Sequence, residues 1–408
     1  MQAESKHIII LGSSLGARLA AVLLARQGQK ITLFCSPGAT DESWESAPPL
    51  LIRFLELLDA RTCLRPAKSR AILTHDCRLE LHGPFSLKDE LRRELGQGAE
   101  ALTQLLISFE ASAEKLTEFF WACEGVPVSL AQRLLLPPQL LRHGLSQQHL
   151  KRTAADVVKR QLADRAMTLL ETCITGHTLV PLTKLSYAEL ALAWAEISSP
   201  QEVAVSALND LLVNRLQNAG GHFVQLSDAG SIEILPGKHP GIKLAGRTYL
   251  ASQVLIGTGL PVNVTHIASL SGGYGRKFSA RFLAGAPSEI LPELSVSALH
   301  GGVPFLARLN NKPSGAEIDI CLPPSARPTE ERELSSWLAA LFPFSELQLR
   351  ELSPGCQLPK LAGFPGRYQP FKLADAHYWN VSGASIFPAL LNTGECLAAM
   401  TLAALLAN

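Results

Sequence analysis

The sequence lacks the paired cysteine and histidine spacings that are typical of metal and redox sites. Its 8 cysteines are scattered without a C-x-x-C pair, and the pairs His75/His82 and His143/His149 have no third ligand close by. Zinc sites and thioredoxin-type sites depend on such spacings. We therefore predict no metal site, and we expect free buried thiols in a reducing compartment.

An excess of charge of either sign is also missing. Lys and Arg number 37 against 36 Asp and Glu, the net charge is +1, and no run of basic residues occurs. A protein that binds nucleic acid by neutralising phosphates needs a basic surface. This composition excludes that class, and we expect no nucleic-acid partner.

Long apolar runs are absent, although 47% of the residues are hydrophobic. Charges interrupt every Leu-rich segment before it reaches the length of a membrane span. Near the N-terminus, the apolar run Ile8–Leu11 is too short for the core of a signal peptide. The sequence therefore predicts a soluble cytoplasmic protein with no membrane span, and peripheral contact with a membrane stays open. At 408 residues the chain is long enough for two or three domains.

The N-terminal segment contains a strand–turn–helix–strand pattern. The apolar run Ile8–Leu11 is followed by small residues from Gly12 to Ala17, then by a helical pattern and a second apolar run, Ile31–Phe34. This order is typical of the dinucleotide-binding βαβ unit, in which the helix N-terminus points its free N–H groups at a pyrophosphate. We expect this unit to organise the rest of the fold.

The dinucleotide fingerprint G-x-G-x-x-G/A is incomplete in this segment. Gly12 and Ala17 fill its first and third positions, but Ser14 replaces the second glycine, which lets phosphates approach the backbone. Cys35 stands where an acidic residue would bind the ribose, and a thiol is a weak acceptor. Two interpretations stay open: a weakened dinucleotide site, or a Rossmann-like unit kept for its packing.

Helical and strand patterns alternate along the rest of the chain. The region from Ser86 to about Glu196 is almost wholly helical, which predicts an inserted domain. The other helices are expected at Leu50–Leu58, Pro200–Gly221, Thr329–Leu341 and Gly394–Leu406, and those within the insertion include Thr153–Thr172 and Ser186–Ile197. Strands are expected at Phe223–Leu226, Ser231–Leu235, Ile242–Ala245, Gln253–Ile256, Val303–Leu309, Ala316–Cys321, Leu347–Glu351 and Tyr378–Ser382, with a hairpin of Ala71–Thr74 and Arg78–Leu81.

Three further motifs give weaker signals. The segment Gly272–Lys277 lacks the spacing of a phosphate-binding P-loop and predicts a glycine-rich turn. The segment Gly12–Gly16 matches the nucleophile elbow G-x-S-x-G, but no oxyanion strand precedes it, so a hydrolase is disfavoured. Asp375 and His377–Trp379 precede or begin the last strand, where they would line a substrate cavity or form the rim of a domain interface.

The whole layout resembles the FAD-dependent oxidoreductase superfamily of phytoene desaturases, protoporphyrinogen oxidases and flavin amine oxidases. The resemblance is carried by the first segment and by NDLLVNRLQNAGGHFVQLSDAGSIEI, YLASQVLIGTG and YWNVSGASIFPALLNTGECLAAMTLAALL, in that order. It implies an α/β fold: a discontinuous Rossmann-like FAD-binding domain of residues 1–75, 200–262 and 370–408. Residues 76–199 and 263–369 would form a second, α+β substrate domain that contains the helical insertion.

The resemblance also implies a set of FAD-binding positions, while no catalytic residue stands out. These positions are Gly12, Ser13, Ser14, Leu15, Gly16, Ala17, Cys35, Ala229, Gly257, Thr258, Gly259, Gly383, Ala384 and Gly394. Besides Ser14 and Cys35, Ala384 replaces the aspartate that follows the glycine of the C-terminal motif, and Ala229 the usual valine beside adenine. The Gly-Gly-Arg stretch and the paired glycines after a proline are missing as well.

Two main hypotheses about function follow. The first is an FAD-dependent oxidoreductase that passes hydride from an apolar or amine substrate to the flavin, since a flavin needs little acid–base help from the protein. The alternative is a flavin-fold protein that has lost its cofactor and acts as a non-catalytic binding or partner subunit. A nicotinamide-dependent dehydrogenase is less favoured, because the C-terminal strand–glycine–helix unit has no place in it. Homo-oligomers are compatible with any of these.

Overall fold

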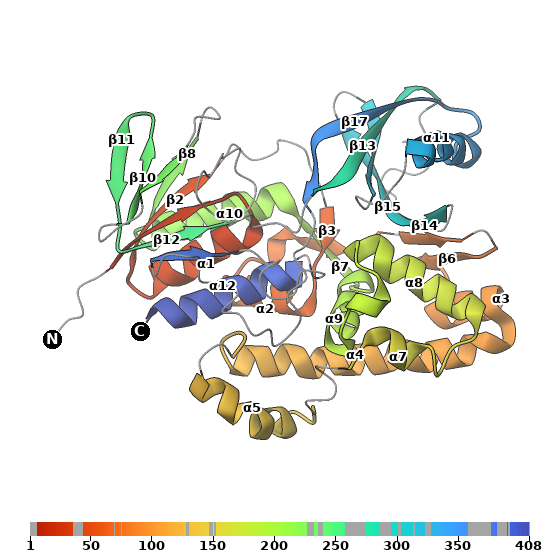
Figure 1. Cartoon of the computed structure of the whole chain (residues 1–408), viewed down its shortest axis with the longest axis horizontal. Helices are drawn as coiled ribbons and strands as arrows, with labels where there is room; N and C mark the ends of the chain where they lie inside the picture. The colour runs from red at the N-terminus through yellow and green to blue at the C-terminus, as the bar shows by residue number, and fades with distance from the viewer. Residues whose placement is uncertain are drawn as a thin grey trace.

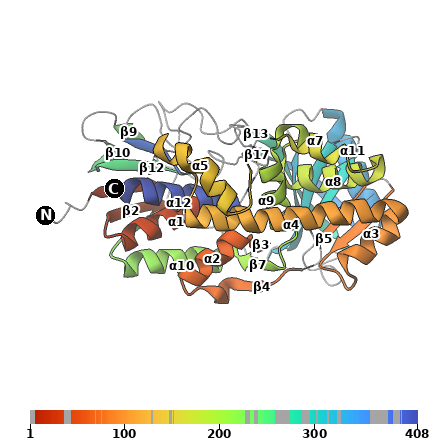
Figure 2. The same cartoon turned by 90° about the horizontal axis from the view of Figure 1, so that it is seen from below.

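The computed structural model describes most of the chain: residues 6–35, 44–68, 70–74, 76–127, 130–146, 150, 152–226, 232–235, 240–257, 274–285, 295–300, 303–312, 315–322, 328–357, 377–381, 390 and 392–407. Within these residues, a five-stranded and a seven-stranded sheet form the two ends of the molecule (Figure 1). The helix α4 (Ala99–Ala122) runs along one side for about 36 Å (Figure 2).

The five-stranded sheet is parallel, with the order β18-β12-β1-β2-β8. Its central strand β1 is fully buried from Ile8 to Leu11, as expected for a parallel strand covered on both faces. Its strands are β1 (His7–Leu11), β2 (Lys30–Cys35), β8 (His222–Gln225), β12 (Gln253–Ile256) and β18 (Tyr378–Asn380). The predicted βαβ unit is confirmed.

Different layers cover the two faces of this sheet. Ile8 and Ile10 belong to the core that includes α1 (Leu15–Arg26) and α12 (Asn392–Ala407). Ile9 and Leu11 point to the opposite face and pack with a small antiparallel sheet of β9 (Glu233–Leu235), β10 (Gly241–Leu244) and β11 (Arg247–Leu250). α1 and α12 lie side by side (Figure 1), so the two ends of the chain meet in one α/β layer structure. The predicted Rossmann-like α/β fold is confirmed.

The seven-stranded sheet has the order β17-β13-β16-β15-β14-β5-β6. Its pairs are antiparallel apart from β14 and β5, and helices α8 (Asp164–Thr178) and α11 (Pro328–Leu341) pack against it. Its strands are β5 (Arg70–Leu73), β6 (Arg78–Leu81), β13 (Tyr274–Ala284), β14 (Ser295–His300), β15 (Val303–Lys312), β16 (Gly315–Leu322) and β17 (Glu346–Gln357). The expected hairpin of β5 and β6 is confirmed, and the division into two domains at the stated boundaries stays a prediction.

The remaining described elements are a further small sheet, several helices and short turns. They are β3 (Trp44–Ser46), β4 (Leu64–Pro66) and β7 (Gln201–Ala204), with helices α2 (Pro49–Leu57), α3 (Leu87–Leu95), α5 (Leu130–Arg142), α7 (Ala154–Val158), α9 (Tyr187–Ile197) and α10 (Val205–Asn218) and short 3-10 turns at Arg61–Cys63, Gly96–Gly98 and Leu182–Lys184. Among the described helices, none has the length and apolarity needed to cross a membrane.

Two expected helices are wrong in part. Residues 201–204, expected to open a helix, form β7, because their backbone pairs with both β3 and β4 and tertiary pairing overrides the local pattern. The expected helix Thr153–Thr172 is split into α7 and α8. The start of α7 is tied to the loop before α9 by the bond from Ala154 N–H to Leu185 O (2.9 Å), and the chain turns again before Asp164.

Candidate dinucleotide site

The turn between β1 and α1 has the backbone shape of a dinucleotide site. Gly12 has a φ of +143°, which L side chains rarely adopt, and its N–H donates to Phe34 O on the neighbouring strand (3.0 Å). Ser14 is the N-cap of α1, and its Oγ accepts a hydrogen bond from Ala17 N–H (3.3 Å). The serine that replaces the second glycine therefore satisfies one of the N–H groups that a phosphate would use.

A carboxylate of the chain lies against the same helix end. Glu395, in the first turn of α12, accepts a hydrogen bond from Gly16 N–H at its Oε2 (2.8 Å). A Cβ built on Gly16 would lie 2.5 Å from that oxygen and 3.0 Å from Val381 O, so only glycine admits the carboxylate here. An acceptor with negative charge is stabilised at a helix N-terminus by the free N–H groups and the helix dipole. Glu395 is therefore a bound anion that the protein itself supplies.

Cys35, at the position of the expected ribose-binding acid, forms its hydrogen bond within the protein. Cys35 ends β2, is buried, and its Sγ donates to Gly12 O (2.9 Å). Burial raises the pKa of this thiol above its ordinary 9.0, although Arg18 and Ser13 oppose the shift. The Arg18 side chain is 4% exposed, and its Nε donates to Ser13 O (3.2 Å). A neutral thiol bonded to the backbone cannot take the place of a carboxylate that accepts from ribose hydroxyls.

The end of β12 packs closely on the same turn. Gly257 N–H donates to Leu11 O (2.6 Å). A Cβ at Gly257 would lie 3.0 Å from Ala17 Cβ and 3.2 Å from Ser14 Oγ. The structure thus brings together most of the described positions implied by the family, and glycine at 257 serves the contact between β12 and α1.

A second carboxylate occupies the N-terminus of α12. Glu196 is 1% exposed, and it accepts from Asn392 N–H (3.1 Å), Thr393 N–H (3.3 Å) and Thr393 Oγ1 (2.9 Å). His177 Nε2 lies 3.9 Å from its Oε1. Burial, the largest effect, raises the pKa of Glu196, but the electrostatic attraction of nearby His177 and the bonds from Asn392 and Thr393 outweigh it, and the pKa is lowered. Glu196 is therefore held ionised at the N-terminus of α12.

Sequence reasoning missed both carboxylates. Two signals were present: an acidic residue inside the apolar pattern of α9, and an acidic residue directly after Gly394 at the start of the last helix. Ala229, Thr258, Gly259, Gly383 and Ala384 lie outside the described residues, and so do Gly272 and Gly273. The rest of the expected glycine-rich turn is wrong: Tyr274 to Lys277 begin β13, because their backbone pairs with β16 and β17.

The aromatic residues of β18 bond to the small antiparallel sheet and to the neighbouring strand β12. Tyr378 Oη donates to Leu235 O (2.5 Å) and accepts from Gly241 N–H (3.2 Å). Trp379 Nε1 donates to Gln253 Oε1 on β12 (2.7 Å). These bonds hold β18 to its neighbours. The described residues contain no group of three or more His, Cys, Asp or Glu that could hold a metal ion.

The described groups do not fit the pyrophosphate of a dinucleotide. Of the N–H groups that open α1, Gly16 N–H is taken by a carboxylate and Ala17 N–H by a serine hydroxyl. A phosphate would have to displace both acceptors, and it would meet a like charge at Glu395. No step of a reaction can be derived through a flavin bound in this arrangement.

Comparison with known proteins supports the fold. No protein-family model matches the sequence, and no curated protein matches it either. The structure is similar to that of an oxidoreductase from Methanosarcina mazei, with a TM-score of 0.60 and 12% identity over 97% of this chain and 99% of that chain. It is also similar to cyclohexylamine oxidase from Brevibacterium oxydans, with a TM-score of 0.54 and 12% identity over 99% of both chains.

A third similar structure is putrescine oxidase bound to putrescine, with a TM-score of 0.55 and 10% identity over 99% of both chains. All three similarities extend over almost the whole chain, so they include both sheets and the helical insertion. At these identities they establish the fold alone. The chain has the fold of FAD-dependent oxidoreductases of the flavin amine oxidase type.

Proposed function

We propose that this chain has kept the flavin amine oxidase fold without using FAD, and that it acts as a non-catalytic binding or partner subunit. The observation that carries the proposal is the bond from Gly16 N–H to the Glu395 carboxylate (2.8 Å). The same helix end holds the cofactor's pyrophosphate in the family that the chain resembles. A carboxylate at that point replaces the cofactor's charge with one that belongs to the protein.

The electrostatic cost of binding a pyrophosphate beside Glu395 supports the proposal. Two unit charges about 4 Å apart repel by about 4 kcal/mol at an effective dielectric constant of about 20. Such a penalty lowers affinity by about a thousandfold. Moving Glu395 away would cost its charge-assisted bond instead, about 1.5–3 kcal/mol. The altered positions Ser14 and Cys35 weaken the site further, because neither offers the contact that the family's glycine or acid would make.

FAD-dependent oxidation of an apolar or amine substrate remains the competing function. It is supported by the similar structures that are named as cyclohexylamine oxidase and putrescine oxidase. It requires that Glu395 leave the helix end when the cofactor binds. The two functions therefore differ in one measurable quantity, which is the affinity of the purified protein for FAD.

Calorimetric titration with FAD tests the proposal. We expect no binding by the wild-type protein at micromolar concentrations. The triple variant Ser14→Gly, Cys35→Glu, Glu395→Ala frees the helix end and restores the ribose acid, so it should bind FAD at least a hundredfold more tightly than the wild type. Glu114→Ala, at an exposed position of α4, is the matched control and should leave FAD binding unchanged.

Each contrary outcome has a distinct meaning. Wild-type binding at micromolar or lower FAD would overturn the loss of the cofactor and favour the oxidoreductase. A triple variant that remains folded but gains no affinity would show that the nucleotide has been assigned to the wrong place. Folding of each variant is checked by its thermal melting curve.

A further inference from the structure

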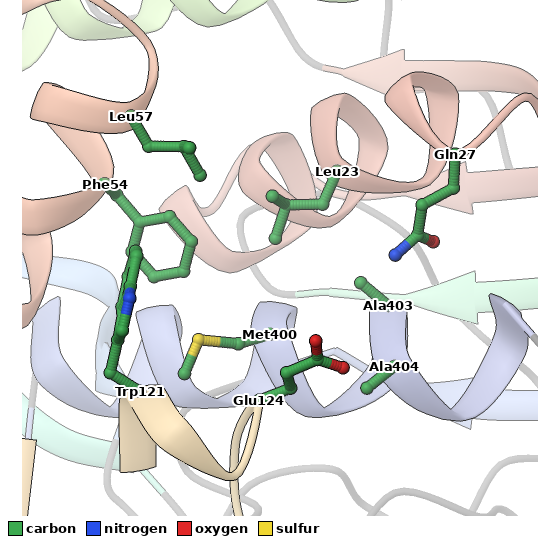
Figure 3. A pocket seen from close by; sticks show the side chains of 9 residues that line it. All are labelled: Leu23, Gln27, Phe54, Leu57, Trp121, Glu124, Met400, Ala403 and Ala404. Carbon is green, nitrogen blue, oxygen red and sulfur yellow. The ribbon is translucent and has the colours of Figure 1, made fainter. Parts of the chain in front are cut away.

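An apolar pocket lies at the end of α1 that is remote from the dinucleotide turn. It is formed where α2 and the end of α4 approach α1 and α12, and its volume is about 250 Å³ (Figure 3). Gln27, at its rim, follows Gly16 by eleven positions, or about 16 Å along the helix axis. The pocket is therefore separate from the candidate dinucleotide site.

Two aromatic rings and a thioether form one wall of the pocket. Phe54 and Trp121 meet edge to face, with ring centroids 5.2 Å apart and an interplanar angle of 68°. Met400 lies beside them, and Leu23 faces them from α1 (Figure 3). Aromatic faces attract cations through the ring quadrupole, and such a wall also accepts an alkyl chain.

A single carboxylate points into this apolar space. The side chain of Glu124 extends from the end of α4 toward the centre of the pocket, between Met400 and the alanines of α12 (Figure 3). Among the described residues, no cation forms an ion pair with it. Glu124 is exposed, so water solvates its carboxylate, and a cationic ligand gains from this charge and from the aromatic rings beside it, whereas an anionic ligand is repelled.

The backbone holds Glu124 in place at some cost. Glu124 has a φ of +52°, and Gly125, which follows it, has a φ of +118°. A Cβ at Gly125 would lie 2.7 Å from Thr401 Cα, and Val126 N–H donates to Thr401 Oγ1 (2.9 Å), so this turn is fixed against α12. A side chain in the left-handed region costs about 1–3 kcal/mol and is retained only where the surroundings impose it.

We propose that this pocket binds the primary ammonium group of a small alkylamine. The alkyl chain would lie against Phe54, Trp121 and Met400, and the ammonium group would donate to the Glu124 carboxylate. Gln27, whose amide lies at the opposite rim, supplies a second acceptor, which favours an ammonium with N–H donors over a quaternary one (Figure 3). The volume corresponds to about eight water-sized groups at about 30 Å³ each, which limits the ligand to a small amine.

Titration calorimetry with three six-carbon probes tests this proposal. Hexylamine is an ammonium ion at pH 7, hexanol is neutral and hexanoate is an anion, so they differ only in the head group. Hexylamine should bind most tightly and hexanoate least. Glu124→Gln should weaken hexylamine binding about two- to fivefold, the size expected for an ion pair at an exposed carboxylate, and leave hexanol binding unchanged.

The matched control is Glu114→Gln, on the same helix and about 15 Å away along its axis. It should bind all three probes as the wild type does. The proposal is overturned if hexylamine fails to bind at millimolar concentrations, binds no better than hexanol, or loses the same affinity in both variants. The site is independent of the proposed loss of FAD, and FAD titration of the same samples distinguishes the failure of one from the failure of the other.

Discussion

Replacing Glu196 removes the buried carboxylate that joins α9 to the start of α12. Glu196 accepts from two backbone N–H groups and a hydroxyl at Asn392 and Thr393, and its Oε1 lies 3.9 Å from His177 Nε2. Glu196→Gln keeps one acceptor oxygen but removes the charge, whereas Glu196→Ala leaves all these donors without an acceptor. The alanine variant should therefore be the less stable of the two.

The size of each effect follows from these contacts. A hydrogen bond to a charged group contributes about 1.5–3 kcal/mol and a neutral one about 0.5–1.5 kcal/mol. Loss of the charge weakens each of the three bonds by about 1–1.5 kcal/mol, so Glu196→Gln should lower the free energy of unfolding by about 3–4 kcal/mol. Breaking a buried charged pair costs about 3–5 kcal/mol, which is our expectation for Glu196→Ala.

The dependence of stability on pH provides a sharper test, because the pKa of Glu189, on the same helix, is shifted in the direction opposite to that of Glu196. The pKa of Glu196 is lowered below 4.5, so its contribution to stability is present above pH 4.5 and is lost as the pH falls through the lowered pKa. Burial raises the pKa of Glu189 above 4.5, although bonds from Ser186 oppose this. Its contribution is present below pH 4.5 and is lost as the pH rises through the raised pKa.

Urea unfolding of the wild type, Glu196→Gln and Glu189→Gln between pH 3 and pH 7 measures these contributions. The stability difference between wild type and Glu196→Gln should grow as the pH rises to about 4.5 and then stay constant. The difference between wild type and Glu189→Gln should shrink with rising pH above about 4.5. Slopes of the same sign for both variants would refute the account of the two carboxylates.

Three further predictions concern packing and thiols. Gly257→Ala should lower the free energy of unfolding by about 1–3 kcal/mol, because the new Cβ would lie 3.0 Å from Ala17 Cβ. Urea unfolding measures this loss, and an unchanged free energy of unfolding would contradict the close contact. Thr401→Val leaves the buried Val126 N–H without its acceptor and should cost about 1–3 kcal/mol in the same assay, while Thr401→Ser should recover most of this loss. Cys173, whose pKa is raised to about 12 by burial, should resist iodoacetamide in the folded protein and react after unfolding, so alkylation of the native protein detected by mass spectrometry would contradict its placement.

The sequence was sufficient to predict the elements whose signals are local. The strand Ile8–Leu11, the turn at Gly12 and the following helix carry their own pattern, and all three were found where expected. The expected helical region begins at Ser86, and Ser86 is the N-cap of α3, because its side chain accepts a hydrogen bond from Asp89 N–H in the first turn. Features of this kind depend on neighbours within about four residues, which a single sequence displays directly.

The decisive contacts of the site could not be predicted in this way. Glu395 and Gly16 are 379 residues apart, and no local pattern indicates that the end of the chain returns its carboxylate to the first helix. The same holds for the strand Gln201–Ala204, whose partners β3 and β4 lie far away in the sequence. The sequence indicated an incomplete fingerprint, and the structure identifies the groups that accept hydrogen bonds from the first N–H groups of α1.

The visible absorption spectrum of the purified protein tests the central claim most directly. It should be recorded as purified, and again after incubation with excess FAD and desalting. We predict no flavin absorption in either sample, because Glu395 and Ser14 hold the N–H groups that the pyrophosphate needs. Flavin bands at near-stoichiometric occupancy in either sample would contradict the claim and assign the protein to the flavin-dependent oxidoreductases by activity as well as by fold.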